Sequence, residues 1–131
     1  MKEITLGIVE DIRNARYVWV CGNGGSAATA EHLTNDLFSK GIKAFCLNSN
    51  TSIMTMIAND FGYEFVFSKQ LDLYANDDDL VVAFSVSGKS PNIINAITGR
   101  RHILIKGEEG ESYEVAEDRH LKLAHNVAKQ I

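Results

Sequence analysis

The sequence lacks the features that mark disulfide-rich, membrane-spanning and secreted proteins. It has two cysteines and one proline among 131 residues. With no CxxC pair, Cys21 and Cys46 predict reduced, buried thiols and not a disulfide or zinc framework. No apolar run approaches the roughly 18 residues that a membrane-spanning helix needs, and residues 1–15 are too charged for a secretory signal. We therefore expect a cytoplasmic protein with no membrane partner.

An excess of positive charge is also missing. Thirteen Lys and Arg stand against seventeen Asp and Glu, for a net charge of −4. No basic face is visible that could collect phosphates, so we expect no nucleic-acid partner. Any anionic ligand must then be held by local groups and not by the overall field of the protein.

Apolar runs and amphipathic segments alternate along the chain, which we expect to form a single domain over residues 1–131. Strands are predicted at 17–21, 43–47, 80–84 and 102–106, and helices at 4–12, 26–39, 52–59, 64–74, 92–97 and 113–130. This alternation predicts an α/β three-layer sandwich with a parallel, flavodoxin-like sheet of about four strands in the order 2-1-3-4. The acidic turn 76–79 is expected to be a solvated loop and not a metal site.

A glycine-rich turn follows the first predicted strand. Residues 22–26 read Gly-Asn-Gly-Gly-Ser and open into a helix whose N-terminus can accept an anion. The spacing matches neither the dinucleotide fingerprint nor the nucleotide P-loop, because Gly25 is followed by Ser26 and not by Lys-Ser/Thr. We expect no nucleotide cofactor. The alternative is a tight strand-to-helix connection that binds nothing.

A second polar loop follows the third predicted strand. Ser85, Ser87 and Ser90 offer three hydroxyl groups, and Pro91 begins a helix behind them. Hydroxyl and backbone N–H donors can surround a phosphate, although simple N-capping by Ser90 explains the same pattern. Because ligands bind at the carboxyl ends of parallel strands, the two loops together make a better site than either alone.

Three segments resemble the sugar isomerase (SIS) domain family, and within it the phosphoheptose isomerases. They are GNGGSAATAEH, SIMTMIANDFGYEFVFSKQ and FSVSGKSPNII, and a weaker match follows around HLKLAHNVAKQI. The resemblance runs over 17–97 and resumes over 103–131. Family members carry an extra N-terminal helical segment and one more helix–strand unit. That unit would fall between Asn95 and His102 here, which implies four strands in place of five.

The resemblance implies a set of substrate-binding residues. The serine loop would hold the phosphate, and the glycine loop and the ANDFG motif would contact the sugar. The matched positions are Asn23, Gly24, Ser26, Asn59, Asp60, Ser85, Ser87 and Ser90.

The resemblance also implies a catalytic pair and a metal set. The catalytic positions are Asp36, where the family has Glu, and His125. Zinc-binding members would place their ligands at His32, Asp36, Glu117 and His125, with Glu117 in place of Gln. From spacing alone, His32 and Asp36 share a helix face as any surface pair could, and His125 could be a partly buried core histidine.

The implied activity is a phosphosugar isomerase. It would convert sedoheptulose 7-phosphate to D-glycero-D-manno-heptose 7-phosphate by acid/base proton transfer, for which a carboxylate and a histidine are suited. The alternative is a non-catalytic sugar-phosphate-binding or regulatory SIS protein. Some such relatives lack the final histidine, so His125 favours the enzyme. The resemblance further implies a homodimer or homotetramer, joined through the first and last helices.

Overall fold

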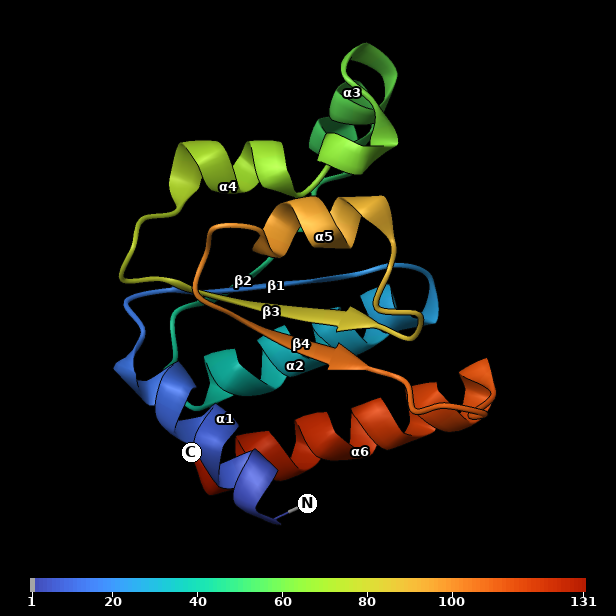
Figure 1. Cartoon of the computed structure of the whole chain (residues 1–131). Helices are drawn as coiled ribbons and strands as arrows, with labels where there is room; N and C mark the ends of the chain where they lie inside the picture. The colour runs from blue at the N-terminus through green and yellow to red at the C-terminus, as the bar shows by residue number, and fades with distance from the viewer. Residues whose placement is uncertain (1) are drawn as a thin grey trace.

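The computed structural model describes residues 2–131, which form one parallel sheet between two layers of helices (Figure 1). The strands are β1 (Val18–Gly22), β2 (Ala44–Cys46), β3 (Leu80–Ser85) and β4 (His102–Lys106). Their order is β2-β1-β3-β4 and every neighbouring pair is parallel, which confirms the predicted topology. The carboxyl ends of β1 and β3 therefore meet at one edge of the sheet.

Helices cover both faces of the sheet. One face carries α1 (Lys2–Asn14), α2 (Gly25–Ser39) and α6 (Tyr113–Gln130). The other carries α3 (Thr51–Asp60), the 3₁₀ turn η1 (Tyr63–Phe65), α4 (Ser68–Tyr74) and α5 (Pro91–Ile97). No helix within residues 2–131 combines the length and the apolar character needed to cross a bilayer.

The helix predicted over 64–74 is instead split into η1 and α4. Val66 and Phe67 separate the two segments, and both side chains are fully buried in the hydrophobic cluster beneath α5. The apolar spacing of this stretch predicts one continuous helix, but the structure has a turn at Val66 and Phe67 that places both side chains in the core.

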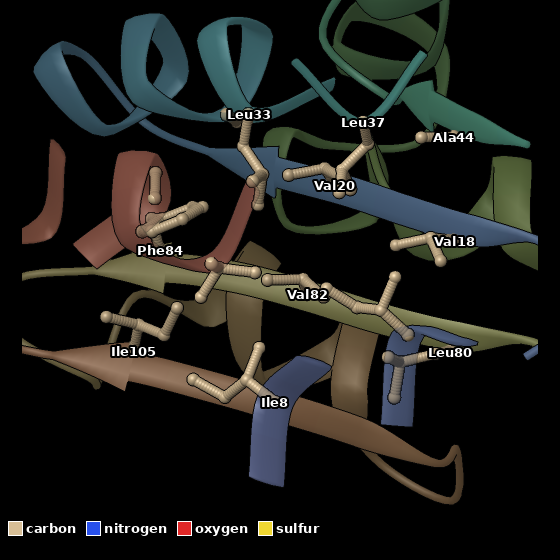
Figure 2. Packing of buried hydrophobic residues seen from close by; sticks show 14 of the residues in the cluster. Ile8, Val18, Val20, Leu33, Leu37, Ala44, Leu80, Val82, Phe84 and Ile105 are labelled. Atoms are coloured by element: carbon tan, nitrogen blue, oxygen red, sulfur yellow. The ribbon is translucent and has the colours of Figure 1, made fainter. Parts of the chain in front are cut away.

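Side chains of the central strands alternate between the two helical layers. Val18 and Val20 belong to the cluster that includes Leu33 and Leu37 of α2, and Figure 2 shows these two leucines beside Val20. Trp19 belongs to the cluster on the opposite face. Every residue of β1 and β3 is buried, as expected for a parallel sheet covered on both sides. Polar groups on these strands are consequently confined to their ends.

The expectation of a solvated acidic turn is wrong for Asp79, which is 4% exposed at the start of β3. Its two carboxylate oxygens accept hydrogen bonds from Arg16 Nε and Nη2 at 2.8 and 2.9 Å. Trp19 Nε1 donates at 3.0 Å. Burial raises the pKa of Asp79, but these donors outweigh it and hold the pKa below its ordinary value. The pairing arises because β3 lies beside β1, which brings residues 16 and 79 together.

Replacing Asp79 with Ala should lower the free energy of unfolding by about 3 kcal/mol at neutral pH, because Trp19 and Arg16 lose their acceptor. The exposed neighbour Asp77 is the matched control. Asp77→Ala should change the free energy of unfolding by less than about 0.5 kcal/mol. The pKa of Asp79 is depressed, so its stabilisation is lost as the pH falls below about 4, the ordinary carboxyl value. Urea unfolding should show the difference between wild type and Asp79→Ala narrowing in acid. Equal losses of unfolding free energy in Asp79→Ala and Asp77→Ala would contradict the stabilising role of Asp79.

Candidate functional site

The glycine loop and the serine loop lie side by side at the carboxyl edge of the sheet. In the parallel register Gly22 is the partner of Phe84, so the loops that follow β1 and β3 start level with each other. Together they line a cavity of about 250 Å³. All six of the predicted residues in the two loops line it: Asn23, Gly24, Ser26, Ser85, Ser87 and Ser90.

The conformation of the first loop requires glycine at one position, and a second glycine packs against α6. Gly24 adopts φ +59°, a left-handed conformation that other residues rarely take. At Gly25 an added Cβ would lie 2.0 Å from Oε2 of Glu117 on α6. The loop therefore turns directly into α2 and brings its backbone against a carboxylate from the last helix, which also lines the cavity.

Two serine side chains organise the second loop. Ser85 Oγ accepts from the backbone N–H of Gly88 at 3.1 Å, and Ser87 Oγ accepts from that of Lys89 at 3.1 Å. Each hydroxyl keeps its own proton to donate to a ligand. Ser90 stands at the N-cap position of α5, yet its side chain makes no capping hydrogen bond. N-capping therefore does not account for the Ser90 hydroxyl.

The other two predicted substrate residues lie elsewhere. Asn59 and Asp60 are exposed at the end of α3, where Asn59 Nδ2 donates to Asp60 Oδ1 at 2.9 Å. Neither lines the cavity between the two loops.

A second cluster joins α2 to α6. The Nε2 atoms of His32 and His125 are 2.9 Å apart, and the His32 Nε2 atom is 3.4 Å from Oδ2 of Asp36. One ligand atom from each of these three residues falls within 4.8 Å of the others. Two imidazole nitrogens and one carboxylate are a donor set that zinc accepts, with room for further ligands.

Glu117 lies apart from this cluster. It precedes His125 by eight residues on α6, a rise of about 12 Å along the helix. The structure places its carboxylate against Gly25 and the serine-loop cavity instead. Of the four implied metal ligands, three are brought together and the fourth faces the other site.

The two sites are well separated along α2. Ser26 and Asp36 are ten residues apart on this helix, a rise of about 15 Å. Asp36 and His125 line their own open groove of about 420 Å³, together with Lys40 and Lys129. Within one chain, the implied phosphate-binding loops and the implied catalytic pair therefore occupy opposite ends of α2.

Two buried polar residues near the cavity had no signal in the sequence. His120 is 1% exposed and its Nε2 atom lies 3.0 Å from the carbonyl oxygen of Lys106. Burial lowers the pKa of His120, which favours the neutral ring. Asn92, 2% exposed in the first turn of α5, exchanges two hydrogen bonds of 2.9 Å with the side chain of Asn23. Each is a single polar residue on an otherwise apolar helix face. Such a residue can be recognised as buried only once its hydrogen-bond partner is known.

Comparisons with known proteins identify curated relatives of this chain. A phosphoheptose isomerase from Helicobacter pylori strain P12 is 35% identical over 114 residues, covering 79% of this chain and 59% of the relative. One from Aliarcobacter butzleri is 39% identical over 101 residues, covering 72% and 53%. The chain thus spans a little over half the length of these curated relatives.

The fold also matches a solved structure. Phosphoheptose isomerase GmhA from Neisseria gonorrhoeae superposes with a TM-score of 0.89 at 26% identity, covering 98% of this chain and 83% of that one. The family model described as SIS domain matches residues 2–103. On this match, and with its parallel sheet and paired polar loops, the chain belongs to the SIS domain family.

Proposed function

We propose that this protein isomerises a phosphorylated seven-carbon sugar, converting sedoheptulose 7-phosphate to D-glycero-D-manno-heptose 7-phosphate. The observation that carries the proposal is the 2.9 Å approach of His125 to His32 beside Asp36, which joins an acid/base pair from two helices. Relatives named phosphoheptose isomerase at 35–39% identity support the same substrate. The chain spans little more than half the length of those relatives.

In this proposal the serine loop holds the phosphate with neutral donors. Among the described residues that line the cavity there is no Lys or Arg, so hydroxyl groups carry the binding. Ser85, Ser87 and Ser90 donate O–H groups, and hydrogen bonds to a charged acceptor are individually strong. Glu117, the carboxylate in the same cavity, suits a sugar hydroxyl, which can donate to it.

Proton transfer falls to Asp36 and His125. One of them removes the proton from C1, next to the ketose carbonyl, and a proton moves from the oxygen on C1 to that on C2. Delivery of a proton to C2 then completes the aldose with no net gain or loss of atoms. Histidine suits this work because it titrates near neutral pH.

His32, Asp36 and His125 would also hold Zn²⁺. Their two nitrogens and one oxygen form a three-ligand set of the kind found in catalytic zinc sites, which leaves a position open for substrate. When bound, the metal would polarise the substrate oxygens. A histidine nitrogen engaged in this way cannot carry a proton, so the other ring nitrogen or Asp36 must do so.

The rise of about 15 Å between Ser26 and Asp36 along α2 supports a proposed assembly of chains. A seven-carbon sugar phosphate cannot readily reach both ends of the helix within one chain, so we propose a homodimer or homotetramer in which partners complete each site. Exposed apolar side chains at Ile4 and Leu6 on α1, and at Val115 on α6, would support the interface. The unpaired thiols of Cys21 and Cys46 fit a cytoplasmic location.

Light scattering at micromolar concentration should give two or four times the chain mass of 14.5 kDa. The physical reason is burial of the exposed apolar side chains of α1 and α6 between subunits. A mass of one chain would argue against a shared site.

Replacing His125 with Gln should lower kcat for sedoheptulose 7-phosphate by at least about 100-fold, because general acid/base catalysis contributes that much or more. Binding of the sugar phosphate should change little, since His125 lies outside the serine-loop cavity. Competition with a chromophoric chelator should show weaker Zn²⁺ binding for the same variant. His102→Gln is the matched control, because His102 is exposed at the start of β4. Turnover by His125→Gln at the wild-type rate would refute the catalytic assignment.

The phosphate assignment is tested separately with the double variant Ser87→Ala, Ser90→Ala. Each lost hydrogen bond to a charged group is worth about 1.5–3 kcal/mol, so the Kd for the sugar phosphate should rise about 100-fold or more. Thermal stability should stay nearly constant, because neither hydroxyl is buried. Ser52→Ala on the exposed start of α3 controls for the loss of a serine. Calorimetry that finds an unchanged Kd would place the phosphate elsewhere.

A further inference from the structure

A cyclic pair of amides joins the two loops of the cavity. Asn92 Nδ2 donates to Asn23 Oδ1 at 2.9 Å, and Asn23 Nδ2 donates back to Asn92 Oδ1 at 2.9 Å. Asn23 belongs to the glycine loop that follows β1. Asn92 belongs to the first turn of α5, two residues beyond Ser90 of the serine loop. Asn92 is 2% exposed and the pair of hydrogen bonds is partly buried, which limits competition from water.

A third element converges on the same amide. The hydroxyl group of Tyr63, in η1, donates to Asn23 Oδ1 at 3.1 Å. The η1 turn is tied in its own right to α5, because Asn95 Nδ2 donates to the carbonyl oxygen of Glu64 at 2.9 Å. The Asn23 side chain is thereby fixed from two directions before any ligand binds.

The hydrogen-bonding capacity of Asn23 is nearly used up. Its side-chain oxygen has two acceptor positions, which Asn92 and Tyr63 occupy. One of its two amide hydrogens goes to Asn92 Oδ1. A single N–H of the Asn23 amide therefore remains free for a ligand. Asn23 lines the cavity, whereas Asn92 does not.

From this arrangement we infer that Asn92 is a positioning residue for the sugar phosphate. It holds the Asn23 amide so that an N–H donor, and not the carbonyl oxygen, is offered to a ligand oxygen. It also couples the glycine loop to the serine loop, so that the two present their donors as one preorganised unit. Groups held before binding lose less freedom on binding, which is how such a residue raises affinity without touching the ligand. The inference rests on the proposed function of this cavity.

A double-mutant cycle separates positioning from general stabilisation. In the full chain, Asn92→Ala should raise the Kd for sedoheptulose 7-phosphate about tenfold, and Asn23→Ala should do at least as much. If Asn92 acts through Asn23, the double variant should bind no more weakly than Asn23→Ala alone. A merely structural role would instead make the two effects add, and that result would overturn the inference.

Two further variants sharpen the test. Asn92→Asp keeps the size and one acceptor, but it sets a carboxylate oxygen against Asn23 Oδ1, so it should weaken binding as Asn92→Ala does. Asn92→Asp also replaces Asn92→Ala in the binding test if Asn92→Ala fails to fold. The matched control is Thr98→Ala, which removes one side-chain hydrogen bond, from Thr98 Oγ1 to the carbonyl oxygen of Ile94, at the far end of the same helix and away from both loops. Its Kd should stay within about twofold of wild type.

Amide hydrogen exchange without ligand completes the experiment. Exchange over residues 22–26 should be faster in Asn92→Ala and Asn92→Asp than in wild type, and unchanged in Thr98→Ala. Unchanged exchange in the Asn92 variants would overturn the coupling of the loops. If the wild-type chain binds no sugar phosphate, the proposed function fails, while the exchange result still decides whether Asn92 holds the glycine loop.

Discussion

Burial of both faces of β1 and β3 is the constraint on which the rest of the molecule depends. Each residue of these strands is buried, and side chains alternate between a layer under α1, α2 and α6 and a layer under α3, α4 and α5. Such strands have no face left for polar chemistry. Polar groups therefore collect where the strands end, and because β1 and β3 are parallel neighbours, their two loops meet at one edge.

The sheet order and the two loops could be predicted from the sequence because their signals are local. Short apolar runs mark the strands, and the glycines and serines that follow mark the turns. The contact between His32 and His125 has no such local signal, because the two residues lie on different helices. Spacing places His32 beside Asp36 on one helix but says nothing about contact with α6. Only the family resemblance suggested that contact, and the same resemblance put Glu117 with them although two helical turns separate it from His125.

Asp79 in the fold and Asn92 beside the site show why some buried polar contacts lay beyond sequence reasoning. A polar residue in a turn or at a helix start is usually exposed, and nothing in the periodicity of the chain indicates otherwise. Asp79 is buried because Arg16 and Trp19 supply donors from 60 residues away or more. Asn92 is buried because Asn23 offers a matching amide. Polar pairings between distant segments leave no pattern in either segment alone.

The helix α2 connects these features, because one rigid element carries both halves of the proposed chemistry. Its N-terminus borders the loop cavity, and its second half presents His32 and Asp36. The replacement of the family's Glu by Asp36 shortens the side chain by one CH₂, yet the carboxylate still lies 3.4 Å from Nε2 of His32. The shorter acid thus keeps its place in the cluster. What it cannot change is the rise of about 15 Å to Ser26, which is set by the helix itself. This separation is the physical basis for our proposal that a second chain, and not side-chain reach, closes a site that uses both ends of α2.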